Sequence, residues 1–276
     1  MAALRQAEDL GCEAIQIFGY RRHEFYFDPK ITAQVSKKLD AEILSWRESL
    51  KTSPVKQVVV HARQVAILAL SDFNRRKLAI EKLRQELELA RMLGAHFFVF
   101  HLGPYEMGMD LNQGLIAGCE ALDHVLRDLP KGSPGVLVEN VPGGGRRMGA
   151  SLEELKVIFG LLKAHWDQLG LCIDLAHLWG AGYDIGNQKG AESFFTSLRN
   201  TLDPALVRAF HINNTRTAIA SHIDDHWHLA QGVIGADVYR YLMKQWPRAI
   251  GILETPKDTV NADEENIEFL LSQRKL

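Results

Sequence analysis

The apolar positions of this chain fall into two kinds of segment, which alternate. The short kind is apolar along most of its length and rich in β-branched and aromatic residues. It occurs at residues 14–18, 57–60, 96–100, 135–138, 169–173, 206–210 and 249–253. Parallel strands that are covered on both faces have this composition, so we expect seven parallel strands.

The longer segments between them have apolar residues at helical spacing. We expect helices at residues 2–10, 33–50, 75–93, 111–129, 151–165, 191–202, 236–245 and 262–273. Ser151 and Glu154 have the spacing of a capping box ahead of an apolar run. Strands and helices that alternate in this way predict a (β/α)8 TIM-type barrel, as a single domain over residues 1–276. Because such a barrel has eight strands, we expect its first strand to be missing from this chain.

The composition is that of an ordinary globular protein, with 46% hydrophobic and 24% charged residues among 276. No apolar run approaches the roughly 20 residues that span a bilayer, so we expect no membrane association. Cys12, Cys119 and Cys172 are far apart and form no CxxC pair. They indicate reduced thiols, and we expect a cytoplasmic monomer. The net charge of −2 means that any nucleic-acid surface must be local.

Side chains that can bind a metal follow six of the seven predicted strands directly. They are His61, His101, Glu139, Asp174, His211 and Glu254. In a barrel of this kind, the carboxyl ends of all strands converge on one face, where active sites lie. One such residue alone is usually a hydrogen-bonded group at the edge of the core, but six in the same position indicate a metal site. Histidine, aspartate and glutamate without a cysteine thiolate favour Zn²⁺ or Mn²⁺.

The motifs around these residues extend the pattern. They read VVVHA, FHLGPY, LVENVPGGG, CIDLAHLWGAGYDI, FHINNT, IDDHWHLAQGVIG and LETP. In content and order, over residues 14–254, they resemble the endonuclease IV family, the trinuclear zinc endonucleases that cut DNA at abasic sites. The additional candidates that these motifs supply are His177, Asp224 and His226.

The resemblance implies three Zn²⁺ ions, with Mn²⁺ possible at some positions. Glu139 would bridge two of them, and Glu139 and Glu254 would have the catalytic roles. The first ion would be held by His61 and His101, the second by Asp174, His211 and Glu254, and the third by His177, Asp224 and His226. For the third ion, Asp225 and His228 offer an alternative pair. A metal lowers the pKa of bound water towards about 7, so no separate nucleophilic side chain is needed.

The expected substrate is double-stranded DNA, cut 5′ to abasic sites or cleared of 3′ blocking groups during base excision repair. The residues expected to contact it are Arg21, Arg22, Gln64, Arg146 and Arg147. Gln64 and Val65 stand where the family inserts side chains into the DNA stack, and Val65 is short. We therefore expect reduced selectivity for abasic sites and relatively strong action at frayed 3′ ends.

Two other functions use the same residues. A sugar isomerase or epimerase of the xylose-isomerase-like barrels needs only a set such as Glu139, Asp174, His211 and Glu254. That function leaves the remaining histidines and Asp224 without a role. A non-catalytic lesion-binding protein is the other alternative, but binding alone does not need three ions.

Overall fold

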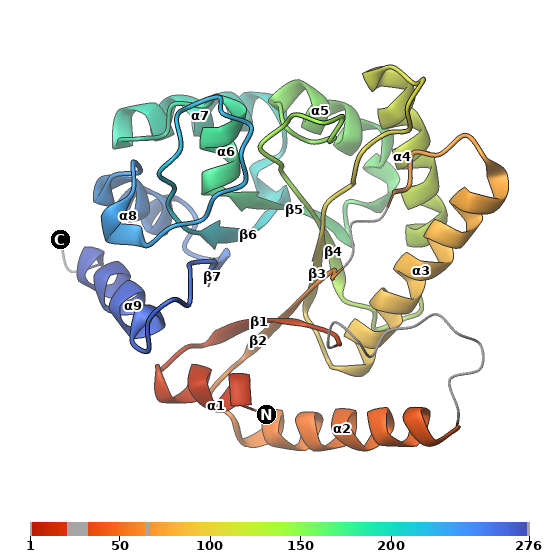
Figure 1. Ribbon diagram of the computed structural model, residues 1–276, viewed down its shortest axis with the longest axis horizontal. Helices are drawn as coiled ribbons and strands as arrows, with labels where there is room; N and C mark the ends of the chain where they lie inside the picture. Colours follow the sequence, from red (N-terminus) through yellow and green to blue (C-terminus); the bar gives the residue numbers. More distant parts are fainter. Residues whose placement is uncertain (1, 21–32, 64–66, 275–276) are drawn as a thin grey trace.

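Seven parallel strands curve into a nearly closed barrel in the computed structural model, with helices around the outside (Figure 1). The structure describes residues 2–20, 33–63 and 67–274. The strands pair in chain order: β1 (Ala14–Phe18), β2 (Gln57–His61), β3 (Phe97–Phe100), β4 (Gly135–Glu139), β5 (Leu169–Asp174), β6 (Val207–Ile212) and β7 (Ile250–Leu253). The predicted TIM-type barrel is thereby confirmed.

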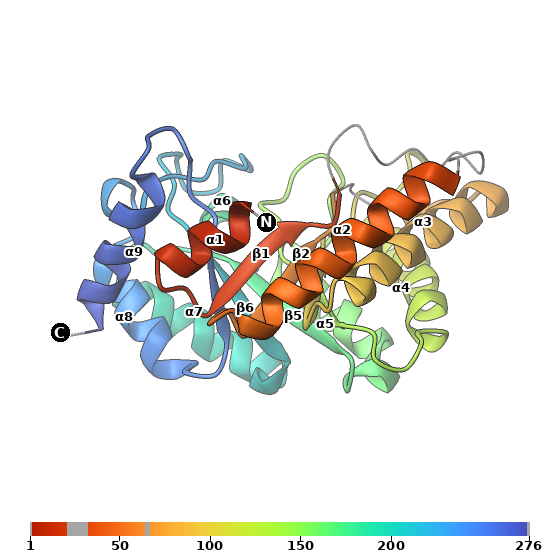
Figure 2. The ribbon, with the colours of Figure 1, turned by 90° about the horizontal axis from the view of Figure 1, so that it is seen from below.

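The two ends of the sheet are β1 and β7. β1 pairs with β2 and β7 pairs with β6, and within the described ranges no backbone ladder joins β1 to β7. The seven strands in the described part of the chain agree with the prediction of seven strands where a closed barrel has eight. The helices α1 (Ala2–Asp9) and α2 (Ala33–Thr52) lie on either side of β1 (Figure 2).

The other helices cover the remaining strands. They are α3 (Phe73–Met92), α4 (Leu111–Arg127), α5 (Leu152–Leu161), α6 (Leu175–Ala181), α7 (Gln188–Thr201), α8 (Ala236–Gln245) and α9 (Ala262–Gln273). Short 3₁₀ turns lie at Lys163–His165, Pro204–Leu206 and Leu229–Gln231. No helix in the described part of the chain is long and apolar enough to cross a bilayer.

The predicted cap at Ser151 is present in part. The Ser151 hydroxyl accepts a hydrogen bond from the Glu154 backbone N–H at 3.1 Å, as expected at a helix start. The Glu154 carboxylate, however, accepts from the backbone N–H of Gly149 and of Ala150. The side chain of Glu154 therefore holds the loop before α5 in place of the Ser151 backbone N–H that a capping box predicts.

Inside the barrel, an apolar layer lies beneath the strand ends. Its buried side chains come from β2 to β7 and are Val59, Val99, Leu137, Cys172, Ala209 and Ile252. Because side chains of a strand alternate between its two faces, the residue two positions further on faces the interior again. Those residues are His61, His101, Glu139, Asp174, His211 and Glu254. The same spacing from Ala14, which packs against this layer, leads in β1 to Gln16.

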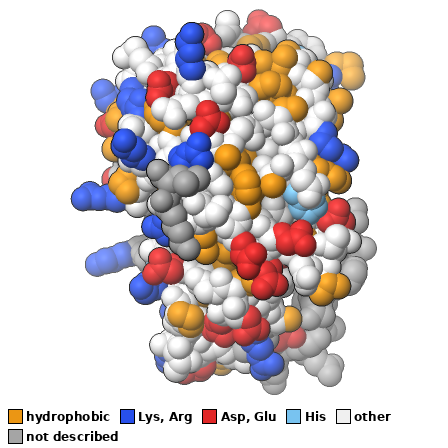
Figure 3. Space-filling view, turned by 90° about the vertical axis from the view of Figure 1, so that its left-hand side faces the viewer, with side chains coloured by type: hydrophobic (Ala, Val, Ile, Leu, Met, Phe, Trp, Pro, Cys, Tyr) orange, Lys and Arg blue, Asp and Glu red, His pale blue; other side chains and the backbone are white. Residues whose placement is uncertain are grey.

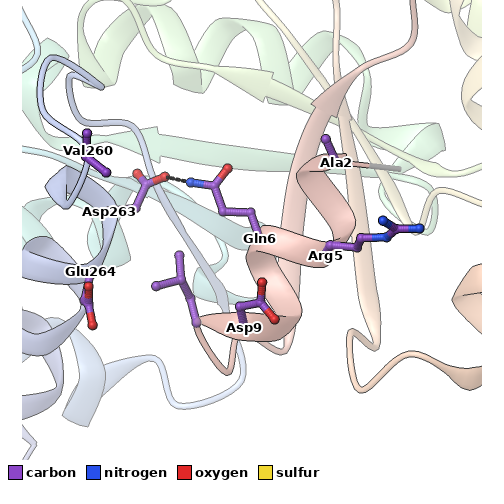
Figure 4. A pocket seen from close by; sticks show the side chains of 8 residues that line it. Ala2, Arg5, Gln6, Asp9, Val260, Asp263 and Glu264 are labelled. Carbon is purple, nitrogen blue, oxygen red and sulfur yellow. Dashed lines mark hydrogen bonds between the residues drawn. The ribbon is translucent and has the colours of Figure 1, made fainter.

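The outer surface near α9 is negatively charged and would repel phosphate. Acidic side chains gather near the middle of the face seen in Figure 3, and the first turn of α9 includes Asp263, Glu264 and Glu265. A pocket between α1 and α9 is lined by polar side chains of both helices, and in it Gln6 Nε2 donates to Asp263 Oδ2 at 2.8 Å (Figure 4). No strand-end histidine lines this pocket.

Candidate metal centre

The predicted ligands meet at the mouth of the barrel in three groups. In each group the possible ligand atoms all lie within 4.8 Å of one another. The groups are His61, His101 and Glu139; Glu139, Asp174, His211 and Glu254; and Asp174, His177 and His226. Glu139 belongs to two groups and so does Asp174, so the three form one continuous cluster.

Glu139 lies at the centre of the cluster and is only 1% exposed. Its Oε2 is 2.9 Å from His61 Nε2 and 3.6 Å from His101 Nε2. Its Oε1 is 2.9 Å from His211 Nδ1. The two carboxylate oxygens therefore face two different groups, which is the arrangement that a bridging ligand needs.

His211 is the one imidazole of the second group and is completely buried. Its Nδ1 lies 3.3 Å from Glu254 Oε2 and 3.7 Å from Asp174 Oδ2, as well as beside Glu139. Three carboxylates thus surround one imidazole nitrogen. Buried like charges are costly without a cation among them, so this group suits a divalent metal.

The third group combines Asp174 with two imidazoles, His177 from α6 and His226 from the loop after β6. His177 Nε2 lies 3.2 Å from Asp224 Oδ1, and His226 Nε2 lies 3.4 Å from the same oxygen. His226 Nε2 is also 3.4 Å from Asp174 Oδ2. The His177 ring is oriented by its Nδ1, which is 2.9 Å from the Asn140 backbone carbonyl. Asp224, with its side chain 53% exposed, closes the group on the solvent side.

The chemistry of the cluster fits zinc. Among the described residues, His101 Nδ1, His177 Nε2 and His226 Nε2 are buried nitrogens that make no hydrogen bond. A buried polar atom without a partner is costly, and a bound metal is one way to satisfy it. The donors are imidazole nitrogen and carboxylate oxygen, a set that suits Zn²⁺ or Mn²⁺.

Two carboxylates of the cluster, those of Glu139 and Asp224, have a lowered pKa. Burial by itself raises the pKa of Glu139, but the adjacent imidazoles of His211 and His101 outweigh burial and hold that pKa well below its ordinary value. The His177 imidazole beside Asp224 lowers the pKa of Asp224 to about 2. Both carboxylates are therefore available as anionic ligands.

The alternative pair for the third group points elsewhere. Asp225 accepts hydrogen bonds from the Thr215 hydroxyl at 3.2 Å and from the Arg216 backbone at 3.1 Å. His228 Nε2 lies 3.0 Å from Asp258 Oδ1, and its other ring nitrogen is bonded to Asn266. Asp225 thus joins two parts of the loop after β6, His228 ties that loop to the segment after β7 and to α9, and neither side chain belongs to the three groups.

Two asparagines that sequence reasoning did not single out support Asp174. Asn140 accepts from the Asp174 backbone N–H at 2.7 Å and donates to the Asp174 carbonyl at 3.1 Å. Asn213 donates to Asp174 Oδ2 at 2.5 Å and accepts from the Ala176 N–H at 2.9 Å. Asn140 comes one residue after Glu139 and Asn213 two residues after His211. This proximity to candidate ligands is the sequence feature by which the two asparagines could have been found.

The predicted DNA contacts are placed only in part. Arg146 and Arg147 are exposed in the loop after β4, where Arg146 Nε donates to the Tyr105 carbonyl at 3.0 Å. Gly143 and Gly144 before them pack closely against His222, since a Cβ at Gly143 would lie 2.9 Å from its ring. Arg21, Arg22 and Gln64 lie outside the described residues.

Comparison of this chain with protein families, known sequences and solved structures points to one fold and one group of relatives. Residues 4–273 match the family described as xylose isomerase-like TIM barrel. A protein of Solibacter usitatus named probable endonuclease 4 is 33% identical over 271 residues, covering 96% of this chain and 90% of that protein. The crystal structure of endonuclease IV from Thermus thermophilus has a TM-score of 0.78 at 26% identity, covering 99% of this chain and 93% of that one.

A D-tagatose 3-epimerase-like protein shares the fold, with a TM-score of 0.70 at 22% identity over 96% of this chain and 90% of that one. Fold and site together define a parallel barrel whose strand ends converge as a cluster of histidines and carboxylates. This chain belongs to the xylose isomerase-like TIM barrel family and, within it, to the endonuclease IV family.

Proposed function

We propose that this protein is a zinc-dependent endodeoxyribonuclease that hydrolyses DNA 5′ to abasic sites and removes 3′ blocking groups in base excision repair. The relatives named endonuclease 4 and endonuclease IV support the reaction class. The observation that carries the proposal is the continuous cluster around Glu139, in which three groups of possible ligands share two carboxylates.

The three groups, together with Asp224 beside His177 and His226, support an assignment of residues to ions. His61 and His101 would hold one, Asp174, His211 and Glu254 a second, and His177, Asp224 and His226 a third, with Glu139 between the first two. Bound zinc supplies positive charge that makes hydroxide available near neutral pH and neutralises phosphate oxygens. Among the residues, Glu139 and Glu254 would have the catalytic roles, because their oxygens border the space between groups.

Substrate contact is proposed for the loop after β4. Arg146 and Arg147 are exposed there, and their guanidinium groups suit phosphate oxygens. Arg21, Arg22 and Gln64 are proposed contacts from the sequence alone. The face beside α9, with its acidic first turn, is the less favourable side for a nucleic acid. The proposed enzyme acts as a cytoplasmic monomer.

A sugar isomerase or epimerase is the second candidate. The group of Glu139, Asp174, His211 and Glu254 is complete by itself, and the epimerase-like protein shares the fold. The third group speaks against this candidate. His177 and His226 each direct a buried nitrogen that makes no hydrogen bond toward Asp224 Oδ1, and a one-metal isomerase has no use for this arrangement.

Metal analysis combined with two DNA substrates tests the proposal. Purified protein should contain about three zinc ions per chain, where an isomerase would contain one or two. It should cut a duplex with an internal abasic analogue and clear a 3′-blocked nick when Zn²⁺ or Mn²⁺ is added, with relatively strong action at the nick. Turnover of a ketose or aldose with neither duplex cut would favour the isomerase, and tight lesion binding without any turnover would favour a non-catalytic protein.

A further inference from the structure

The barrel strand without a candidate ligand contributes a glutamine to the cluster. Gln16 lies in β1, two residues after Ala14, at the level where the other strands place their histidines and carboxylates. It is partly buried and contacts two candidate ligands at once. Its Oε1 is 2.9 Å from His211 Nε2, and its Nε2 donates to Glu254 Oε1 at 2.5 Å.

The two contacts fix the orientation of the amide. An ionised carboxylate only accepts hydrogen bonds, so the NH₂ of Gln16 must face Glu254. The carbonyl oxygen of Gln16 then faces His211 and can only accept, which requires a proton on His211 Nε2. The opposite orientation would place oxygen against carboxylate and is therefore disfavoured.

The proton on Nε2 determines which nitrogen of His211 is left for a metal. Nδ1 points into the second group, towards Glu139, Glu254 and Asp174. With Nε2 protonated, a cation can replace the proton at Nδ1. A histidine that binds a metal usually donates its other N–H to such a partner, which sets the tautomer and the ring orientation.

The same amide also assigns the two oxygens of Glu254. Oε1 is bonded to Gln16, whereas Oε2 faces His211 Nδ1 at 3.3 Å and His226 Nδ1 at 3.7 Å. Oε2 is thus directed into the cluster. Gln16 therefore orients the second-group ligands that follow β6 and β7, although it comes from β1, which does not pair with β7.

We propose that Gln16 is the positioning residue of the second metal site: it holds His211 in the Nε2-protonated tautomer and presents one oxygen of Glu254. This proposal rests on the proposed function, since it requires that the second group binds zinc. Gln16 would act through its two partners, Glu254 and His211. Loss of such a partner weakens metal binding by about 10- to 100-fold.

The experiment measures zinc affinity by chelator competition in the full chain. Gln16→Met keeps the length of the side chain but removes both hydrogen bonds. One of the bound zinc ions should be held about 10- to 100-fold more weakly, with the others little changed. Gln6→Met is the matched control, because Gln6 also donates to a carboxylate, Asp263, but far from the cluster. Its zinc affinities should equal those of the unaltered protein.

Gln16→Asn extends the test if Gln16→Met fails to fold. Asparagine keeps the amide but is one carbon too short to reach both partners, so it too should weaken one ion. A second readout is the His211 Nε2 proton in the zinc-loaded, ¹⁵N-histidine-labelled protein. It should exchange slowly in the unaltered protein and rapidly in the folded variant.

The outcomes separate the two proposals. Unchanged affinity for every ion in a folded Gln16 variant, beside zinc binding by the unaltered protein, overturns the role of Gln16 alone. A lower melting temperature with all zinc affinities retained also overturns it, because it makes Gln16 a purely structural residue. Failure of the unaltered protein to bind zinc overturns the proposed function itself.

Discussion

Single side chains at the mouth of this barrel serve more than one neighbour. Glu139 is the clearest case, because Oε2 faces His61 and His101 while Oε1 faces His211. Asp174 is another: Oδ1 accepts from the His177 backbone at 2.8 Å, and Oδ2 faces His211 and His226. Loss of one such carboxylate therefore affects two groups, whereas loss of a peripheral histidine affects one.

Glu139→Gln should impair two metal sites together. An amide offers a single neutral acceptor where the carboxylate offers two anionic oxygens. We expect the zinc content to fall and DNA cleavage to drop by a factor on the order of 10²–10³. Metal analysis and single-turnover cleavage check this, with Glu48→Gln, an exposed residue paired with Lys51, as the control. Full zinc content and activity in Glu139→Gln would refute the bridging role.

Asp224 and Asp225 are neighbours in sequence with different surroundings, which makes them a matched pair. Asp224→Ala should lose the third ion, because Asp224 is the carboxylate closest to His177 Nε2 and also contacts His226 Nε2. Asp225→Ala should keep its zinc, because Asp225 holds Thr215 and Arg216 instead. Zinc per chain after gel filtration distinguishes them, and the reverse result would assign the third ion to Asp225.

At the scale of elements, the strands were predictable and one helix was not. Every strand end that carries a candidate ligand follows an apolar run, so counting two residues on from the buried layer finds His61 or Glu139 directly. The helix α6 gave no signal, because Leu175, Ala176, His177 and Leu178 are all buried and no polar face marks its period. Its start at Asp174 is a cap that also serves the metal cluster.

The sequence was least informative about the residues that hydrogen-bond to the candidate ligands. Gln16 is not a usual metal ligand, so a search for ligand types passes over it. Asn140 and Asn213 have the residue type of ordinary loop positions, and only the structure shows that both bind Asp174 by hydrogen bonds. Which oxygen of a carboxylate faces which imidazole depends on the register between strands, which residue types alone do not fix. The roles assigned to the site residues, and the single domain over residues 1–276, stay predictions.

Asn213 connects β6 to the start of α6 by hydrogen bonds. Its loss should therefore lower the stability of the fold as well as disturb the site. Asn213→Ala removes the donor to Asp174 and leaves the buried Ala176 N–H without an acceptor. We expect the free energy of unfolding of the metal-free protein to fall by about 1–3 kcal/mol. Urea unfolding measures this, with the exposed Asn200→Ala expected within about 0.5 kcal/mol of the unaltered protein. Equal stability of the two variants would contradict this role.

For the whole molecule, the histidines of the cluster link the stability of the fold to pH. Protons on them stabilise the metal-free protein at low pH, whereas bound zinc stabilises it more at high pH. Burial lowers the pKa of His177 and His211, but adjacent groups, Asp174 beside the first and Cys172 and Glu139 beside the second, raise both well above the ordinary value. Raised pKa values in the folded state stabilise the metal-free protein at low pH. That contribution is lost as the pH rises through the folded-state values.

Zinc requires the same nitrogens to be free of protons, so its contribution grows where that of the protons is lost. We expect the increase in melting temperature on adding zinc to be larger at about pH 8 than at about pH 6. Thermal unfolding at constant free zinc, with and without a chelator, measures the difference. A zinc effect that is equal at both pH values would show that the histidines of the cluster are not the ligands. A single transition in both states would also support the single-domain prediction.

The apolar layer formed by Val59, Val99, Leu137 and their neighbours has a further consequence. It supports the six strand-end candidate ligands from below, while His177, Asp224 and His226 and the chain segments that would meet a substrate lie above it, in α6 and in loops. An insertion or exchange in those loops leaves the supporting strands in place. Evolution can therefore change the target of such a barrel from nucleic acid to a small sugar while the strand-end part of its metal site is kept, so that reaction and target diverge separately.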